Sequence, residues 1–168
     1  MYSFGKEVPK MIAIEPYRGK HSEEIISLIL HIQNDEAKIG LSLDEQPDLK
    51  DIASYYQASG GEFWLATDCG RVVGTIGLML RENNCAILKK FFVDADYRSR
   101  KVGLALYRAL LSFAQEKRVK HILLDTPSVA AASHRFYERA GFRQITAGDL
   151  PVAYTYPDRD SLLYLLDL

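Results

Sequence analysis

The spacing of apolar residues changes along the chain, and these changes divide the sequence into predicted helices and strands. A short apolar run near residues 11–15 predicts a first strand. Residues 21–34 carry isoleucine and leucine on one broad face, which predicts a helix with Ser22 as its N-cap. A second, shorter helix is expected over residues 46–61, opened near Pro47 and ended by two glycines.

The middle of the chain has the pattern of a sheet. Three apolar runs occupy residues 62–68, 71–80 and 84–93. The segments between them, at residues 69–70 and 81–83, contain glycine, glutamate and asparagine, which are typical of tight turns. The pattern predicts three consecutive antiparallel strands.

The last third of the chain alternates between helical and strand patterns. We expect a long amphipathic helix from about Gly103 to Lys117. The later elements are a strand at 121–126, a helix at 130–140, a strand at 142–147 and a last strand at 161–168. The order β-α-α-β-β-β-α-β-α-β-β implies a mixed α/β (α+β) sheet with helices on both faces.

Composition narrows the class of protein. The 168 residues are 48% hydrophobic and 26% charged with a net charge of −1, which is typical of one soluble domain over residues 1–168. The chain has no excess of basic residues, so we do not expect it to bind nucleic acid or a membrane surface. No stretch reaches the ~18 apolar residues of a membrane span, and the first sixteen residues lack the apolar core of a secretory signal. Cys69 and Cys85 lack metal-ligand spacing, so we expect a cytoplasmic protein with reduced thiols and no metal.

Residues 96–106, DYRSRKVGLAL, place positive charge directly before a glycine that opens the long helix. A helix N-terminus presents unpaired backbone N–H groups and about half a positive charge. Gly103 permits close approach of the backbone to a ligand, and Arg98, Arg100 and Lys101 add charge. The corner suits a pyrophosphate, although a basic helix start with a packing glycine would explain the same residues.

The same corner resembles the acetyl-CoA loop of the GCN5-related N-acetyltransferase (GNAT) superfamily, whose signature is Q/R-x-x-G-x-G/A. Residues 100–105 match every fixed position, and neither the dinucleotide nor the P-loop glycine pattern occurs. FFVDADYR at 91–98 resembles the family's preceding strand and turn, and SHRFYERAGF at 133–142 resembles its later helix. The chain departs from the family at Ser133, which replaces an alanine, and at Ala130, which replaces an asparagine that often contacts the cofactor.

The resemblance implies a splayed, largely antiparallel sheet and transfer of an acetyl group from acetyl-CoA to an amine by direct attack in a ternary complex. Backbone N–H groups of residues 89–93 would stabilise the oxyanion, since each fixed donor is worth roughly 3–4 kcal/mol. The residues it implies for acetyl-CoA are Phe91, Phe92, Val93, Arg98, Arg100, Lys101, Val102, Gly103, Leu104, Ala105 and Ser133.

Two side chains are candidates for proton transfer. Tyr137 matches the family's tyrosine that protonates the thiolate leaving group, and a reference pKa of about 10 suits a donor; a core tyrosine is the alternative. Asp125 stands twelve positions earlier, where some members place the general base, but it could equally cap the loop after its strand. His134 or a water relay could also serve as the base. Cys85 has no histidine partner by motif, and we do not expect a covalent intermediate.

The acceptor is expected between the first two helices and the loop before the last strand. The connection at 33–49 is acidic, which could suit a polyamine, an aminoglycoside or a lysine side chain, or could simply be a solvated loop. Glu36 is the candidate substrate-binding residue, and Tyr154 and Tyr156 are candidates for a lid.

The sequence therefore predicts an acetyl-CoA-dependent N-acetyltransferase that acts on a small-molecule or protein amine. Its rivals are an acyltransferase with another acyl donor or acceptor, a CoA-binding regulatory module without catalysis, and a nucleic-acid binder, which the charge balance disfavours. The apolar last strand could support a homodimer.

Overall fold

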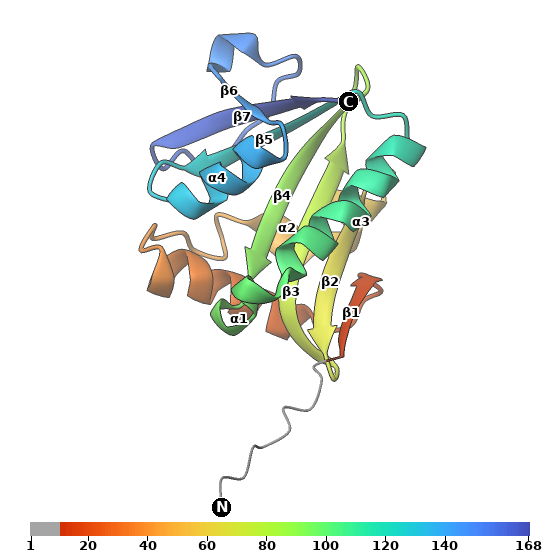
Figure 1. Cartoon of the computed structure of the whole chain (residues 1–168), viewed down its shortest axis with the longest axis vertical. Coiled ribbons are helices and arrows are strands. Elements are labelled where there is room, and N and C mark those ends of the chain that lie inside the picture. Colours follow the sequence, from red (N-terminus) through yellow and green to blue (C-terminus); the bar gives the residue numbers. More distant parts are fainter. Residues whose placement is uncertain (1–10) are drawn as a thin grey trace, which may run out of the picture.

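The computed structural model describes residues 11–168, which form a seven-stranded sheet in the order β1-β2-β3-β4-β5-β7-β6 (Figure 1). The strands are β1 (Ile12–Pro16), β2 (Glu62–Asp68), β3 (Arg71–Leu80), β4 (Cys85–Val93), β5 (His121–Pro127), β6 (Arg143–Ile145) and β7 (Ser161–Asp167). The helices are α1 (Ser22–Leu30), α2 (Pro47–Lys50), α3 (Val102–Glu116) and α4 (Ala131–Arg139). β4 and β5 are parallel and the other neighbours are antiparallel. The predicted class and order of elements are confirmed.

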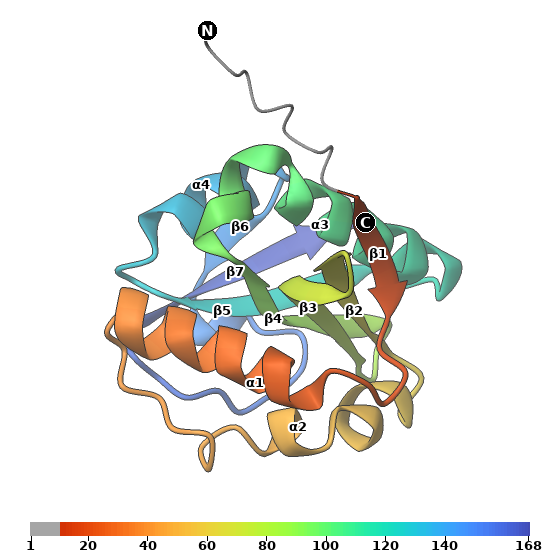
Figure 2. The same cartoon turned by 90° about the horizontal axis from the view of Figure 1, so that it is seen from below.

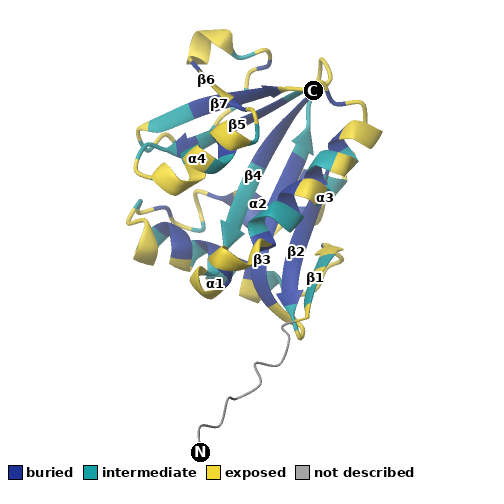
Figure 3. Cartoon of the chain, in the orientation of Figure 1, coloured by how far each residue is buried: buried dark blue, intermediate teal, exposed yellow. Residues whose placement is uncertain are grey.

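Helices cover both faces of the sheet (Figure 2). α3 and α4 lie on one face, where Leu106 and Val73 belong to the larger apolar core. α1 and α2 lie on the opposite face, where Ile25 and Val72 belong to a second core. Neighbouring residues of one strand enter different cores because successive side chains of a strand point to opposite faces. The central strands are consequently buried along most of their length (Figure 3).

The first helix differs from its prediction at both ends. Its N-cap is His21, in the left-handed conformation with φ 72°, and not Ser22, so the predicted cap is wrong. The Ser22 hydroxyl is unavailable for capping because it lies 2.8 Å from the Tyr17 hydroxyl and hydrogen-bonds with it. At its other end α1 continues into a wider π-helical turn, His31–Glu36, which carries the chain toward the divergence of the sheet.

The second predicted helix is divided in two. α2 ends after one turn, and a separate π-helical segment follows at Ala53–Gln57. Between them Asp51 leaves the helical region, and its carboxylate accepts the amide of Ser54 at 3.2 Å. An aspartate that caps a new helical start competes with continuation of the helix before it, which explains the break.

β4 and β5 diverge part-way along their length (Figure 1). β4 pairs with β5 only over its first three residues, up to Ile87, but stays with β3 as far as Val93. The register with β3 shifts near Thr75, whose hydroxyl donates to the Lys90 carbonyl at 2.7 Å, and Lys90 itself has φ 55°. From Leu88 onward, β4 therefore exposes a backbone edge that β5 does not occupy.

The predictions about membrane spans, cysteines and a secretory signal can be compared with the described residues. Of the described helices, none is long and apolar enough to span a bilayer. Cys69 and Cys85 are both free cysteines. The expectation that no secretory signal is present falls mainly on residues 1–10, which lie outside the described residues.

Candidate active site at the divergence of β4 and β5

A cleft with a volume of about 620 Å³ follows the divergence of the two strands. α4 and the start of α3 line it on one face of the sheet, through side chains such as Phe136 and Ser133. The π-helical turn after α1 and the loop before β7 line it on the other, through Gln33 and Arg159. The cleft therefore offers two approaches to the exposed edge of β4, one from each face of the sheet.

The start of α3 lies at the first of these approaches. Lys101 caps the helix in the left-handed conformation with φ 60°, and its carbonyl accepts the amide of Ala105 at 3.1 Å. Helix geometry leaves the preceding amides, those of Val102, Gly103 and Leu104, without an acceptor inside the helix. Three N–H groups and the helix dipole thus converge beside the cleft, as the pyrophosphate prediction requires.

Gly103 lies between this helix start and β4. A Cβ atom added to it would meet the side chains of Phe91 and Val93 at 3.5–3.7 Å, which are ordinary contact distances. The protein's own packing therefore has room for alanine at this position. Close approach of a ligand to the backbone is a sufficient reason for glycine here.

The three predicted basic residues have different surroundings. Arg98 lines the cleft, donates from Nε to the Val93 carbonyl at 3.0 Å and donates to Glu36 Oε2 at 2.5 Å. The guanidinium of Arg100 lies 5.6 Å from the centre of the Tyr97 ring, and Lys101 is exposed. Only Arg98 is part of the lining, while the other two add to the local positive field.

The other predicted cofactor residues also divide into two groups. Phe91, Phe92, Val93, Gly103 and Ser133 line the cleft. Val102 is buried at the first position of α3, and Leu104 and Ala105 are half-buried along that helix. Any contact of these three residues with a cofactor would therefore come from the backbone.

Tyr137 approaches the divergence from α4. Its ring packs against Phe91, Phe142 and Tyr164, and it lines the cleft. Within the described part of the chain its hydroxyl has no hydrogen-bond partner. Burial, and secondarily the charge of Asp125, raise the pKa of Tyr137 far above its ordinary value. The phenol is therefore held protonated and can act as a hydrogen donor into the cleft.

Asp125 approaches the same point from β5. It is half-buried, lines the cleft, and its Oδ1 accepts from the Tyr154 hydroxyl at 3.4 Å. Burial raises the pKa of Asp125, and the charges of Lys89 and Lys90 oppose that rise. A carboxylate with a raised pKa is a stronger base than an exposed aspartate.

The alternative base and the candidate lid have other contacts. His134 lies outside the cleft lining, and its Nε2 is 2.9 Å from the Pro127 carbonyl, which suits an N–H donor. The rings of Tyr154 and Tyr156 lie 5.3 Å apart, and Tyr154 also reaches Asp125. Tyr154 therefore contacts the carboxylate on the face of the sheet opposite α4, and neither tyrosine lines the cleft.

Sequence analysis missed a buried polar network beside the cleft. The side-chain amides of Gln33 and Gln46 exchange two hydrogen bonds, of 2.8 and 2.9 Å. The Lys90 ammonium donates to Gln46 Oε1 at 2.9 Å and lies 3.6 Å from Asp48 Oδ2, which accepts from the Tyr56 hydroxyl at 2.7 Å. Burial lowers the pKa of Lys90, and Asp48 opposes the change. The available signal was a pair of lysines inside an otherwise apolar strand.

The acidic connection after α1 is largely neutralised by partners from this chain. Glu36 lines the cleft, but its carboxylate accepts from Arg98 and lies 3.6 Å from the His31 ring. The other ion pairs are Asp44 with Lys50, Glu45 with Arg159 and Asp48 with Lys90, and Asp35 forms a hydrogen bond with the His31 ring. The predicted negative surface for a cationic acceptor is consequently much weaker than the sequence indicates.

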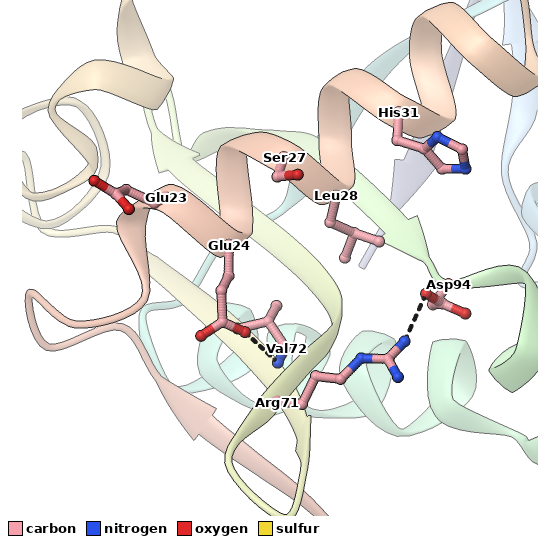
Figure 4. Close-up of a pocket in the computed structure, with 8 residues that line it drawn as sticks. All are labelled: Glu23, Glu24, Ser27, Leu28, His31, Arg71, Val72 and Asp94. Atoms are coloured by element: carbon pink, nitrogen blue, oxygen red, sulfur yellow. Dashed lines mark hydrogen bonds and ion pairs between the residues drawn. The ribbon is translucent and has the colours of Figure 1, made fainter.

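A second, smaller hollow lies along α1 and the start of β3 (Figure 4). There Arg71 pairs with Asp94 at 3.2 Å, and Glu24 accepts the amide of Val72 at 3.1 Å. None of the candidate catalytic residues lines this hollow. We therefore place the candidate active site in the larger cleft.

Comparison with known proteins identifies the class. The sequence model of the acetyltransferase (GNAT) family matches residues 27–142, which include the start of α3, Asp125 and Tyr137. The chain belongs to the GNAT family. The predictions of a GNAT fold and of the acetyltransferase class are confirmed.

Individual relatives agree with this assignment. N-acetylaspartate synthetase of Danio rerio is 35% identical over 100 residues, which are 58% of this chain and 36% of that protein. The chain thus spans about a third of the length of this curated relative. A GNAT-family acetyltransferase structure from Staphylococcus aureus Mu50 has a TM-score of 0.90 and 39% identity, over 94% of this chain and 99% of that one. The PaiA N-acetyltransferase of Thermoplasma acidophilum, solved in complex with coenzyme A, shares the fold with a TM-score of 0.73 and 16% identity, over 94% and 99% of the two chains.

Proposed function

We propose that the chain is a single catalytic domain that transfers an acetyl group from acetyl-CoA to an amine of a small molecule or protein. The observation that carries this proposal is the meeting of two groups at the divergence of β4 and β5. Tyr137, a protonated donor, enters from one face, and Asp125, a carboxylate with a raised pKa, enters from the other. The family membership supports the same chemistry.

The donor would lie on the α3 and α4 side of the cleft. The free amides at Val102, Gly103 and Leu104, with the positive field of the nearby basic residues, suit the diphosphate of acetyl-CoA. The exposed edge of β4 after Leu88 suits the amides of pantetheine. An N–H group on that edge would also receive the thioester oxygen as it becomes an oxyanion.

The proposed reaction is direct transfer within a ternary complex. Asp125, directly or through a water molecule, removes a proton from the acceptor amine. The amine nitrogen forms a bond to the acetyl carbon while the carbon–sulfur bond breaks. The sulfur leaves as a thiolate and takes a proton from Tyr137. The proton that the nitrogen loses as it becomes an amide returns to the Tyr137 phenolate through solvent, and Asp125 releases its own proton to solvent. The products are the N-acetylated amine and coenzyme A.

The remaining predictions are compatible with this proposal. Tyr137 and Asp125, the proposed proton donor and base, both line the cleft. This favours an enzyme over a CoA-binding module without catalysis. Among the described residues, no three His, Cys, Asp or Glu side chains are grouped as metal ligands. The absence of a metal cofactor, nucleic-acid binding and membrane binding stay predictions, as do the cytoplasmic location, a homodimer and the role of Glu36 in acceptor binding.

An amine-library screen tests the proposal directly. The protein is incubated with acetyl-CoA and each amine, and free coenzyme A is measured with a thiol reagent. The library starts with amino acids, because one relative is named N-acetylaspartate synthetase, and continues with polyamines, aminoglycosides and lysine peptides. Calorimetry with acetyl-CoA and with an oligonucleotide accompanies the screen. Tight binding of acetyl-CoA without acetylation of any amine would favour the regulatory module.

A further inference from the structure

The cations of the cleft differ in whether this chain already neutralises them. Four cationic side chains belong to the lining: Lys89, Lys90, Arg98 and Arg159. Three of them pair with carboxylates of the protein, at 3.6 Å for Lys90–Asp48, 2.5 Å for Arg98–Glu36 and 2.9 Å for Arg159–Glu45. Over residues 11–168, Lys89 has neither an ion pair nor a hydrogen bond to its ammonium group. It is half-buried, so its charge is only partly hydrated.

Lys89 lies on the same face of the sheet as Asp125. Ile87 pairs with Leu123 across the last contact of β4 with β5, and both pack in one apolar cluster. Lys89 and Asp125 each follow two positions later on their strands, so they point to the same side. The charge of Lys89 opposes the raised pKa of Asp125, yet the two groups do not form an ion pair. An ammonium and a carboxylate thus face the same widening space and are separated.

This face lies opposite the start of α3. The core that contains Ile87 and Leu123 includes no residue of α3 or α4, whereas Val102 and Leu106 of α3 belong to the core on the other face. Lys89 is therefore not placed to bind the diphosphate of acetyl-CoA. Its charge is available to the second substrate.

We propose that the acceptor carries a carboxylate beside its reacting amine, and that Lys89 binds this carboxylate while Asp125 receives the amine. The substrate class is thus an α-amino acid or a similar zwitterionic amine. A zwitterion matches the two opposite charges of this face in one molecule. A polyamine would instead bring a second cation toward Lys89, which selects against it by repulsion. The inference rests on the proposed function, since it places a substrate in that site.

Matched acceptors test the inference. Each amino acid is compared with its carboxamide and with the amine that lacks the carboxyl group, by coenzyme A release. Binding of the same compounds to the complex of the protein with coenzyme A is measured by calorimetry. The variants are Lys89→Gln, Lys89→Arg and, as a matched control, Lys120→Gln, which replaces an exposed lysine before β5.

We expect at least one amino acid to be used about tenfold or more better than its carboxamide, because a hydrogen-bonded charge pair is lost in the amide. Lys89→Gln should abolish this preference through the KM of the amino acid, and Lys89→Arg should restore part of it. Lys120→Gln should behave as the wild type. Equal use of carboxamides, or a preference that survives Lys89→Gln, overturns the inference.

The calorimetry separates the two proposals. Lys89-dependent binding of an amino acid without any release of coenzyme A would support the acceptor class and contradict acetyl transfer. Acetylation of amines that lack a carboxylate, with no effect of Lys89→Gln, would support acetyl transfer and contradict the acceptor class.

Discussion

The guanidinium of Arg98 donates to Glu36 Oε2 at 2.5 Å and so joins the segment before α3 to the π-helical turn after α1. The two residues come from the two sides of the cleft, and both line it. Under the proposed function, this ion pair links the donor side of the cleft electrostatically to the acceptor side. The same guanidinium is the lining cation nearest in sequence to the free amides of α3.

Glu36→Gln should strengthen binding of coenzyme A. The change removes a negative charge near the proposed diphosphate site and releases Arg98 from its ion pair. The pair is partly exposed, so the gain should be modest, about two- to fivefold, in line with the 0.2–1 kcal/mol of exposed pairs. Arg98→Met should weaken binding. Calorimetry at low and high salt measures both, and weaker binding by Glu36→Gln would contradict this view of the pair.

Gly103→Ala should separate stability from donor binding. The new methyl group has room in the protein's own packing, and alanine is preferred to glycine in a helix by about 0.5–1 kcal/mol. We expect a higher free energy of unfolding and a lower affinity for coenzyme A. Ser112→Ala, at an exposed position of the same helix, should stabilise without any change in affinity. Unchanged coenzyme A binding by Gly103→Ala would remove this glycine from the donor site.

Tyr137→Phe should lower kcat by about a hundredfold or more, the usual contribution of a positioned proton donor, while leaving coenzyme A affinity nearly unchanged. Because burial raises the pKa of Tyr137, its deprotonation should cause no loss of rate up to about pH 10, near the ordinary tyrosine pKa. Steady-state kinetics across pH and calorimetry provide the two readouts. Tyr164→Phe is the control, since that hydroxyl donates to Glu138 and does not line the cleft. Loss of binding without loss of kcat in the Tyr137 variant would reject the assigned role.

Asp125 should make activity sensitive to acid at a higher pH than an ordinary aspartate would. The base acts as the carboxylate, so kcat/KM should rise as pH increases through the raised pKa of Asp125. Asp125→Asn should lower the rate and remove this acidic limb. A limb that persists in the variant would assign the base to another group.

The Asp125 carboxyl group should also make the stability of the fold depend on pH: stability should fall as pH rises, whereas activity should increase. Its pKa is higher in the folded than in the unfolded chain, so the folded state binds the proton more tightly. Stability from this group is present at low pH and is lost as pH rises from the ordinary value through the raised one. Asp125→Asn should therefore gain more stability over the wild type at pH 7.5 than at pH 4, as measured by thermal denaturation. An equal difference at the two pH values would contradict the raised pKa.

Lys90→Met should destabilise the fold by about 3 kcal/mol, because it leaves Asp48 buried without its cation. The double variant Lys90→Met/Asp48→Asn should regain part of the loss, since no charge then remains buried. Denaturant unfolding measures both. Lys50→Met, which breaks the exposed pair with Asp44, should have no measurable effect. A double variant no more stable than Lys90→Met would show that the pair does not act as a unit.

Local sequence patterns predicted the elements reliably where a single residue type, or a regular spacing of apolar residues, determines the secondary structure. The three middle strands were predicted to within one residue of their observed bounds, since each apolar run is bounded by turn residues. The capping residue of α1 was mistaken because the local preference for serine at an N-cap is overridden by the hydrogen bond between the Ser22 and Tyr17 hydroxyls. The second helix was predicted as one element because the hydrophobic pattern does not show the capping contact of Asp51 with the amide of Ser54.

The candidate site shows the same division. Residues 100–105 could be assigned to a helix start from their order alone, and Tyr137 from the motif around it. The role of Lys89 could not be assigned, because a lysine in a strand has meaning only once its partners are known. Its lack of a carboxylate partner depends on where Asp48, Glu36 and Glu45 lie, and these are far from it in sequence.

By itself, the order of residues determined the elements, their succession and the glycine-opened helix start, since these follow from backbone sterics, hydrophobic period and contacts within a few residues. Only the tertiary structure decided which charges are neutralised, which stay available, and where β4 leaves β5. Those properties depend on distances between side chains and on burial, and a linear pattern of residues contains neither.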